Sequence, residues 1–207
     1  MTPIETIMRT APVIPVLVID DVATAKPIAE ALVAGGLRVL EVTLRTEAAL
    51  NAIAEMKQVD GAIVGAGTVL DARALERSIA AGAEFIVSPG LTDKLADAAR
   101  HEQIPFLPGI ANSGDIMRGL DHGLKHFKFF PAEASGGISA LKALAGPFGG
   151  IQFCPTGGIT ESSAPDWLAL DPVLCVGGSW LVPKGETDYD AIRSRAEAAS
   201  GLARTPD

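Results

Sequence analysis

Short apolar runs alternate with alanine-rich amphipathic segments along most of this 207-residue chain, and the pattern recurs roughly every twenty-odd residues. The apolar runs have the length of strands, whereas the segments between them have helical spacing. Several of these segments begin after Asp, Thr or Ser and end near Gly, the usual residues at the two ends of a helix. The predicted strands are 13–19, 39–44, 62–69, 85–88, 106–110, 126–130, 151–155 and 173–176. The predicted helices include 23–34, 47–57, 72–81, 93–102 and 139–144.

Alternation of this kind predicts parallel strands that are joined by helical crossovers, the α/β class. Eight such units favour a closed (β/α)₈ TIM barrel over an open doubly wound sheet. No Gly-x-Gly-x-x-Gly follows the first run and no Gly-Lys-Ser/Thr occurs, so the nucleotide-binding versions of the open sheet lose support. The segment 2–9 precedes the first strand and is expected to form a short helix that covers the bottom of the barrel.

The composition limits the class of protein and its partners. A hydrophobic content of 48% suits a single barrel domain over residues 1–207. The net charge is −8 and the basic residues do not cluster, which argues against a nucleic acid or an anionic membrane as partner. The first residues lack the pattern of a signal peptide, and no apolar stretch reaches the ~20 residues of a membrane span, so the sequence predicts a cytoplasmic protein.

The cysteines and histidines do not have the spacing of a metal site. Cys154 and Cys175 lie in apolar runs and are expected to be buried, reduced thiols. His101 and His122 are expected at the ends of helices, and His126 is expected to pack at the start of its strand. We therefore predict no metal.

Lys128 lies in the aromatic run His126-Phe127-Lys128-Phe129-Phe130, which has the composition of a buried strand. Burial favours the neutral amine, and a neutral amine can attack a carbonyl and form a Schiff base. The residues leave a second interpretation open, in which Lys128 lies on an exposed face or on an edge strand.

Strand parity gives Lys128 a partner. Glu41, Thr43 and Arg45 share one face of their strand, and the alternating apolar residues share the other. Glu41 and Lys128 are the only Asp, Glu or Lys residues in the middle of the eight runs, and two buried opposite charges favour proximity. We expect them to face each other in the lumen; the alternative is an ion pair with a purely structural role.

Small and polar residues recur where the strands end. Thr68 follows Gly-Ala-Gly, and Pro89 and Gly90 follow the fourth strand. The seventh and eighth strands end in Thr156-Gly157-Gly158 and Gly177-Gly178-Ser179. Paired glycines expose backbone N–H groups, and the loops after strands seven and eight hold a phosphate in many barrels. Ordinary turns are the alternative.

Four segments resemble the 2-keto-3-deoxy-6-phosphogluconate (KDPG) aldolase family, which also acts on 4-hydroxy-2-oxoglutarate. They are 39–46 (VLEVTLRT), 65–69 (GAGTV), 128–133 (KFFPAE) and 153–159 (FCPTGGI), and the resemblance extends over residues 5–195. It implies that Lys128 forms the Schiff base and that Glu41 is the general acid and base. It also implies a set of substrate-binding residues: Arg45, Thr68, Pro89, Phe130, Gly157, Gly158, Gly178 and Ser179, with Thr156 beside them.

The resemblance implies a class I aldolase that reversibly cleaves 2-dehydro-3-deoxy-6-phosphogluconate to pyruvate and glyceraldehyde 3-phosphate, and 4-hydroxy-2-oxoglutarate to pyruvate and glyoxylate. No cofactor is expected, because the imine is the electron sink. The family is usually homotrimeric. Two other functions remain open from the residues: a phosphate-binding barrel isomerase or epimerase that uses no imine, and a non-catalytic barrel that binds sugar phosphates.

Overall fold

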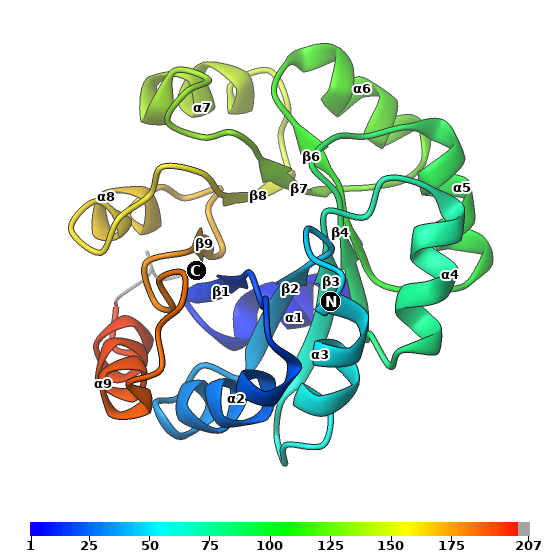
Figure 1. The fold of residues 1–207 in the computed structure, drawn as a ribbon. Coiled ribbons are helices and arrows are strands. Elements are labelled where there is room, and N and C mark those ends of the chain that lie inside the picture. The colour runs from blue at the N-terminus through cyan, green and yellow to red at the C-terminus, as the bar shows by residue number, and fades with distance from the viewer. Residues whose placement is uncertain (203–207) are drawn as a thin grey trace.

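The computed structural model describes residues 1–202, which form a ring of parallel strands surrounded by helices (Figure 1). The strands are β1 (Val13–Leu17), β2 (Val39–Thr43), β3 (Ile63–Gly67), β4 (Phe85–Val87), β5 (Phe106–Leu107), β6 (Gly109–Ile110), β7 (His126–Phe129), β8 (Gln152–Pro155) and β9 (Val176–Gly178). The helices are α1 (Pro3–Thr10), the 3₁₀ helix η1 (Val22–Thr24), α2 (Ala25–Ala34), α3 (Ala49–Met56), α4 (Ala72–Ala80), α5 (Asp93–His101), α6 (Ser113–Asp121), α7 (Gly137–Ala145), α8 (Ala164–Leu168) and α9 (Tyr189–Ser200).

The strands close into a barrel, which confirms the predicted fold class. One set of hydrogen-bonded strands has the order β5-β4-β3-β2-β1-β9, and the other has the order β6-β7-β8. Parallel bridges between Phe153 and Val173 and between Thr156 and Gly177 join β8 to the β9 segment. At the other junction, β5 and β6 are the two halves of the predicted strand 106–110, separated by Pro108, which has no N–H to donate to a ladder.

The predicted eighth strand, 173–176, was placed too early. Val173 forms an isolated parallel bridge with Phe153 of β8, but its N–H donates to the carbonyl of Leu170 (2.9 Å), so it is not yet part of a regular strand. Regular pairing with β1 begins only at Val176, opposite Val13. The apolar character of 173–175 reflects burial of the approach to the strand and not the strand itself.

Side-chain caps explain where several helices begin. Asp71 accepts a hydrogen bond from the N–H of Ala74 (2.7 Å) at the start of α4, and Thr92 accepts one from Leu95 (3.2 Å) at the start of α5. Each cap satisfies an N–H that has no partner within its helix. The predictions at 72–81 and 93–102 are correct to within one residue at each end.

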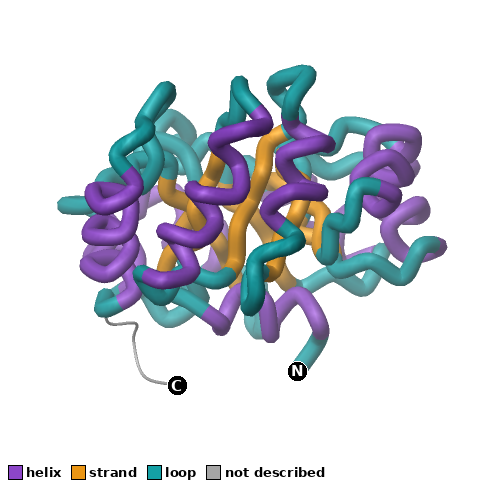
Figure 2. Tube along the Cα trace, turned by 60° about the horizontal axis from the view of Figure 1, so that its bottom comes forward, coloured by secondary structure: helices purple, strands orange, loops and turns teal. Residues whose placement is uncertain are grey.

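Helix α1 closes the end of the barrel at which the strands begin, as the sequence predicted; we call this the lower end (Figure 2). Ile4, Ile7 and Met8 are buried in a cluster with side chains from the strands. The strand side chains of this cluster are Ile14, Val39, Phe85, Val87, Leu107 and Cys154, together with Leu174 and Cys175 just before β9. Apolar side chains from α1 and the strands therefore fill the lumen beneath the Lys128 level.

Both cysteines are buried and reduced, as predicted. His101 is the last residue of α5, and His122 is the C-cap of α6. Within residues 1–202, no helix is long and apolar enough to cross a membrane. In the same range, no three His, Cys, Asp or Glu side chains are grouped so that they could hold a metal ion.

Candidate active site

Lys128 and Glu41, which are 87 residues apart in the sequence, meet in the lumen. The Lys128 ammonium donates to Oε1 of Glu41 over 3.1 Å, and the two side chains are only 7% and 3% exposed. Lys128 is therefore neither on an exposed face nor on an edge strand. Burying two charges costs free energy, and removing either group would leave the other buried without a partner of opposite charge.

The strand registers explain why these two side chains converge. Glu41 lies opposite Val16 of β1 and Gly65 of β3, and Lys128 lies opposite Gly109 of β6 and Cys154 of β8. In a closed barrel, alternate residues of each strand point inward, so both side chains enter the lumen. The ring of Phe130, two residues after Lys128, lies 5.2 Å from Nζ.

Glycine at position 67 provides the space for the Glu41 carboxylate. A Cβ atom at this position would overlap Oε1 of Glu41 and would lie 2.7 Å from its Cγ. Gly67 is therefore required by the close approach of a functional side chain.

The ends of β2 and β3 carry the next two predicted site residues. Thr68 has φ of 57°, which is rare for a β-branched residue and costs on the order of 1–3 kcal/mol. Arg45 is exposed and lines a cavity of about 370 Å³ together with residues of α3 and α4, including Arg77. Arg45 follows the C-terminal end of β2, two residues after Thr43 and four after Glu41.

Pro89 lies above the strand that neighbours Lys128. A Cβ atom at Gly109 would overlap the carbonyl oxygen of Pro89, and Gly109 is the register partner of Lys128. The hydroxyl of Ser88 donates to the carbonyl of Gly90 (2.6 Å), which tightens this turn. The Pro89 carbonyl thus packs against β6, the strand that pairs with β7 at Lys128.

The two Gly-Gly loops are neighbours, because Thr156 pairs with Gly177. Gly157 and Gly158 have φ of 102° and 81°, which glycine adopts without strain. Gly158 and Ser179 are exposed, whereas Thr156 is buried and its hydroxyl points back to the carbonyl of Cys154 (3.4 Å).

Gly178 is also buried: a Cβ atom there would overlap the indole ring of Trp180. The predicted phosphate-binding residues therefore form two groups, an exposed one and a buried one that packs beneath it.

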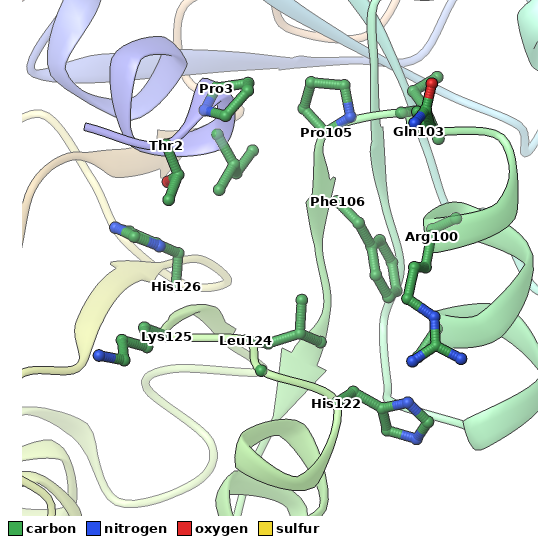
Figure 3. Close-up of a pocket in the computed structure, with 15 residues that line it drawn as sticks. Thr2, Pro3, Arg100, Gln103, Pro105, Phe106, His122, Leu124, Lys125 and His126 are labelled. Carbon is green, nitrogen blue, oxygen red and sulfur yellow. The ribbon is translucent and has the colours of Figure 1, made fainter.

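A cavity of about 500 Å³ lies at the opposite, lower end of the barrel (Figure 3). Arg100 and His126 lie on opposite sides of it, with Phe106 and Leu124 between them, and Thr2 of the α1 cap lies at its edge. None of the predicted site residues lines this cavity.

His126 ties α1 to the barrel at this lower end. It is buried, and its Nε2 lies 3.8 Å from Oε2 of Glu5. Burial lowers the pKa of His126, and the nearby Glu5 carboxylate only partly opposes this effect. The positive charges of Arg9 and Lys125 lower the pKa further.

This depressed pKa predicts a loss of stability in mild acid. In the unfolded chain His126 becomes protonated near pH 6.5, whereas in the folded chain it becomes protonated only at lower pH. The unfolded state therefore binds more protons below about pH 6.5, and the free energy of unfolding falls as the pH drops. We expect urea denaturation to show a steeper loss for the wild type than for His126→Gln between pH 7 and pH 5. The extra slope is at most about 1.4 kcal/mol per pH unit. Equal slopes would contradict a depressed pKa at this residue.

A closed parallel barrel with a buried lysine and a buried carboxylate paired in its lumen defines a class of protein, the barrels in which an interior amine can react with a carbonyl compound. The profile of the KDPG and KHG aldolase family matches residues 4–195. The chain belongs to this family, as the sequence motifs indicated.

Named relatives agree with this membership. The chain is 58% identical to the 2-dehydro-3-deoxy-phosphogluconate aldolase of Zymomonas mobilis, over 99% of this chain and 98% of the relative. It is 55% identical to the KHG/KDPG aldolase of Escherichia coli, over 96% and 95% of the two chains. A crystal structure of KDPG aldolase from Legionella pneumophila, with pyruvate captured at low pH as a covalent carbinolamine intermediate, superposes with a TM-score of 0.93 at 44% identity, over 96% and 98% of the two chains.

Sequence reasoning missed one residue that the structure connects to this site. Glu133 belongs to the KFFPAE segment, yet its partner Trp167 is 34 residues away on α8, and no local pattern links the two.

Proposed function

We propose that this chain is a class I aldolase that reversibly cleaves 2-dehydro-3-deoxy-6-phosphogluconate to pyruvate and glyceraldehyde 3-phosphate. It would also cleave 4-hydroxy-2-oxoglutarate to pyruvate and glyoxylate. The observation that carries the proposal is the 3.1 Å contact between the buried Lys128 amine and Glu41. The family membership specifies the substrate class.

Lys128 starts the reaction as a nucleophile. Glu41 takes a proton from the Lys128 ammonium, the resulting neutral amine attacks the C2 ketone to form a carbinolamine, and loss of water leaves a protonated imine. Glu41 transfers the protons of this step, since its carboxylate already contacts the amine. The imine then accepts the electron pair of the C3–C4 bond as that bond breaks.

Glu41 also removes the proton from the C4 hydroxyl, directly or through a water molecule, so that the leaving carbon departs as an aldehyde. The remaining enamine takes up a proton at C3 and becomes the imine of pyruvate. Water then adds to this imine, releases pyruvate and restores the amine. The water lost in imine formation is thus regained. Overall, the C3–C4 bond and the O–H bond at C4 are replaced by a C4 carbonyl and a new C–H bond at C3.

The remaining residues bind the two ends of the substrate. Arg45 would hold a carboxylate through its paired N–H donors, with Thr68 beside it. Pro89 and Phe130 would line the pocket around the pyruvyl part. The phosphate would bind at the exposed edge of the Gly-Gly loops, formed by Gly157, Gly158 and Ser179, while Thr156 and Gly178 would support these loops from below.

Pyruvate release coupled to lactate dehydrogenase tests this function. We expect the wild type to consume NADH with either substrate. Binding of the phosphorylated keto acid without pyruvate release would instead favour a non-catalytic barrel. Comparing the gluconate with the galactonate epimer in the same assay would establish the preference at C4.

Gly67→Ala should disable the site although both catalytic side chains remain. The new Cβ would displace the Glu41 carboxylate from Lys128, and a misplacement of about 1 Å can cost on the order of 10²-fold in rate. We expect kcat to fall by about that factor in the coupled assay. Gly149→Ala is the matched control, since a Cβ there meets no heavy atom within 4 Å. Similar kcat values for the two variants would contradict the assigned role of Glu41.

A homotrimer and a cytoplasmic location also stay predictions, the first from the family resemblance. Sedimentation equilibrium would test the trimer, for which we expect three times the monomer mass.

A further inference from the structure

The chain that leaves β7 is paired with the first Gly-Gly loop. The N–H of Ala132 donates to the carbonyl of Thr156 (2.8 Å), and the N–H of Glu133 donates to the carbonyl of Gly157 (3.1 Å). The ladder between β7 and β8 therefore continues beyond both strands and reaches the loop. This pairing fixes the beginning of the loop but not its far end.

The side chain of Glu133 reaches the far end. Its Oε1 accepts a hydrogen bond of 3.1 Å from Nε1 of Trp167, which lies on α8, the helix that follows the loop. Trp167 is fully buried, and its ring lies 6.3 Å from that of Phe129. A buried indole N–H without an acceptor would be destabilising, so this bond anchors Glu133 to a rigid element.

The stem of Glu133 also covers the second glycine of the loop. A Cβ atom at Gly158 would lie 2.8 Å from both Cβ and Cγ of Glu133, and Gly158 has a positive φ of 81°. Glu133 thus holds the loop at three points. Its N–H binds Gly157, its side-chain stem packs on Gly158, and its carboxylate binds Trp167 of the helix that follows the loop.

From these contacts we infer that Glu133 is a positioning residue that fixes the Gly157–Gly158 loop and so sets the affinity for the phosphate end of the substrate. The inference rests on the proposed function. A carboxylate would repel a phosphate, and one oxygen of Glu133 is already engaged by Trp167, so its contribution is to hold the loop and not to bind the ligand. The hydrogen bond between Lys128 and Glu41 involves no atom of Glu133.

The test separates the phosphate end of the substrate from the pyruvyl end. For each variant, KM and kcat are measured with the phosphorylated keto acid, and the pyruvate concentration that half-saturates borohydride trapping is measured separately. Glu133→Ala and Trp167→Phe remove the same hydrogen bond from its two sides, and Glu133→Gln keeps an acceptor for Trp167. Glu161→Ala, which removes an exposed carboxylate from the same loop, is the matched control.

We expect Glu133→Ala to raise KM about tenfold or more, the effect of losing a hydrogen bond to a charged group. Its kcat and its half-saturating pyruvate concentration should stay within about twofold of the wild type. Trp167→Phe should raise KM in the same way, and the double variant should add little to Glu133→Ala. Glu133→Gln and Glu161→Ala should resemble the wild type.

An unchanged KM in both single variants would overturn the inference. A parallel rise in KM and in half-saturating pyruvate would also overturn it, because that pattern indicates general loosening of the barrel. If Glu133→Ala does not fold, Trp167→Phe still decides. Failure of the proposed function is distinct, since the wild type itself would then release no pyruvate.

Discussion

Lys128→Ala should lower pyruvate production by roughly 10⁴- to 10⁶-fold, the scale on which enzymes lose activity when a covalent nucleophile is removed. Lys128 is the one lysine in the strands of the described residues 1–202, so no other strand offers an amine to the lumen. Lys125→Ala is the matched control, because this exposed lysine lies just before the same strand. It should retain near-normal turnover in the coupled assay.

Removing the amine also leaves the Glu41 carboxylate buried without its partner, which costs about 3–5 kcal/mol in comparable pairs. Thermal denaturation of the variant must therefore accompany the kinetics. A folded Lys128→Ala protein whose turnover lies within tenfold of the wild type would contradict imine catalysis. It would instead favour a barrel enzyme that binds phosphate and uses no lysine.

Glu41→Gln should lower kcat by about 10²- to 10⁴-fold, the usual contribution of a general acid–base group. The amide keeps the shape and an acceptor for the Lys128 amine, but it cannot take up the C4 hydroxyl proton. We expect KM to change little and some pyruvate adduct still to form on Lys128. Steady-state kinetics and adduct trapping on one preparation would measure the two effects together.

Glu47→Gln provides the matched control for this substitution, because Glu47 is exposed in the loop after β2. An unchanged kcat in Glu41→Gln would remove Glu41 from the chemistry and leave it as a structural partner of Lys128. A complete loss of adduct would place it earlier in the reaction, at the activation of the amine.

The periodic alternation of apolar runs and helical segments was enough to predict the barrel, because each unit has a local signature. Strand parity was enough to predict that Glu41 and Lys128 enter the lumen. Their 3.1 Å contact depends on the registers of separate strands, which no single strand encodes. Parity gave the face of each side chain, and the two lone opposite charges gave the pairing. Only the closed ring gave the distance between them.

Other features were not predicted, and most of them depend on contacts between distant segments. Pro108 divides one predicted strand into β5 and β6, and the approach to β9 is as apolar as the strand itself. The burial of Thr156 and Gly178 depends on packing by neighbouring side chains and segments, which the sequence does not show. The bond between Glu133 and Trp167 depends on how α8 docks on the barrel.

Borohydride reduction of the wild type in the presence of pyruvate, followed by peptide mass spectrometry, tests whether Lys128 forms the imine. We expect one modified peptide, the one containing Lys128, with the added mass of a reduced pyruvate imine and loss of activity in proportion to the modification. An unmodified Lys128 peptide, or an adduct on another lysine while activity is lost, would contradict it.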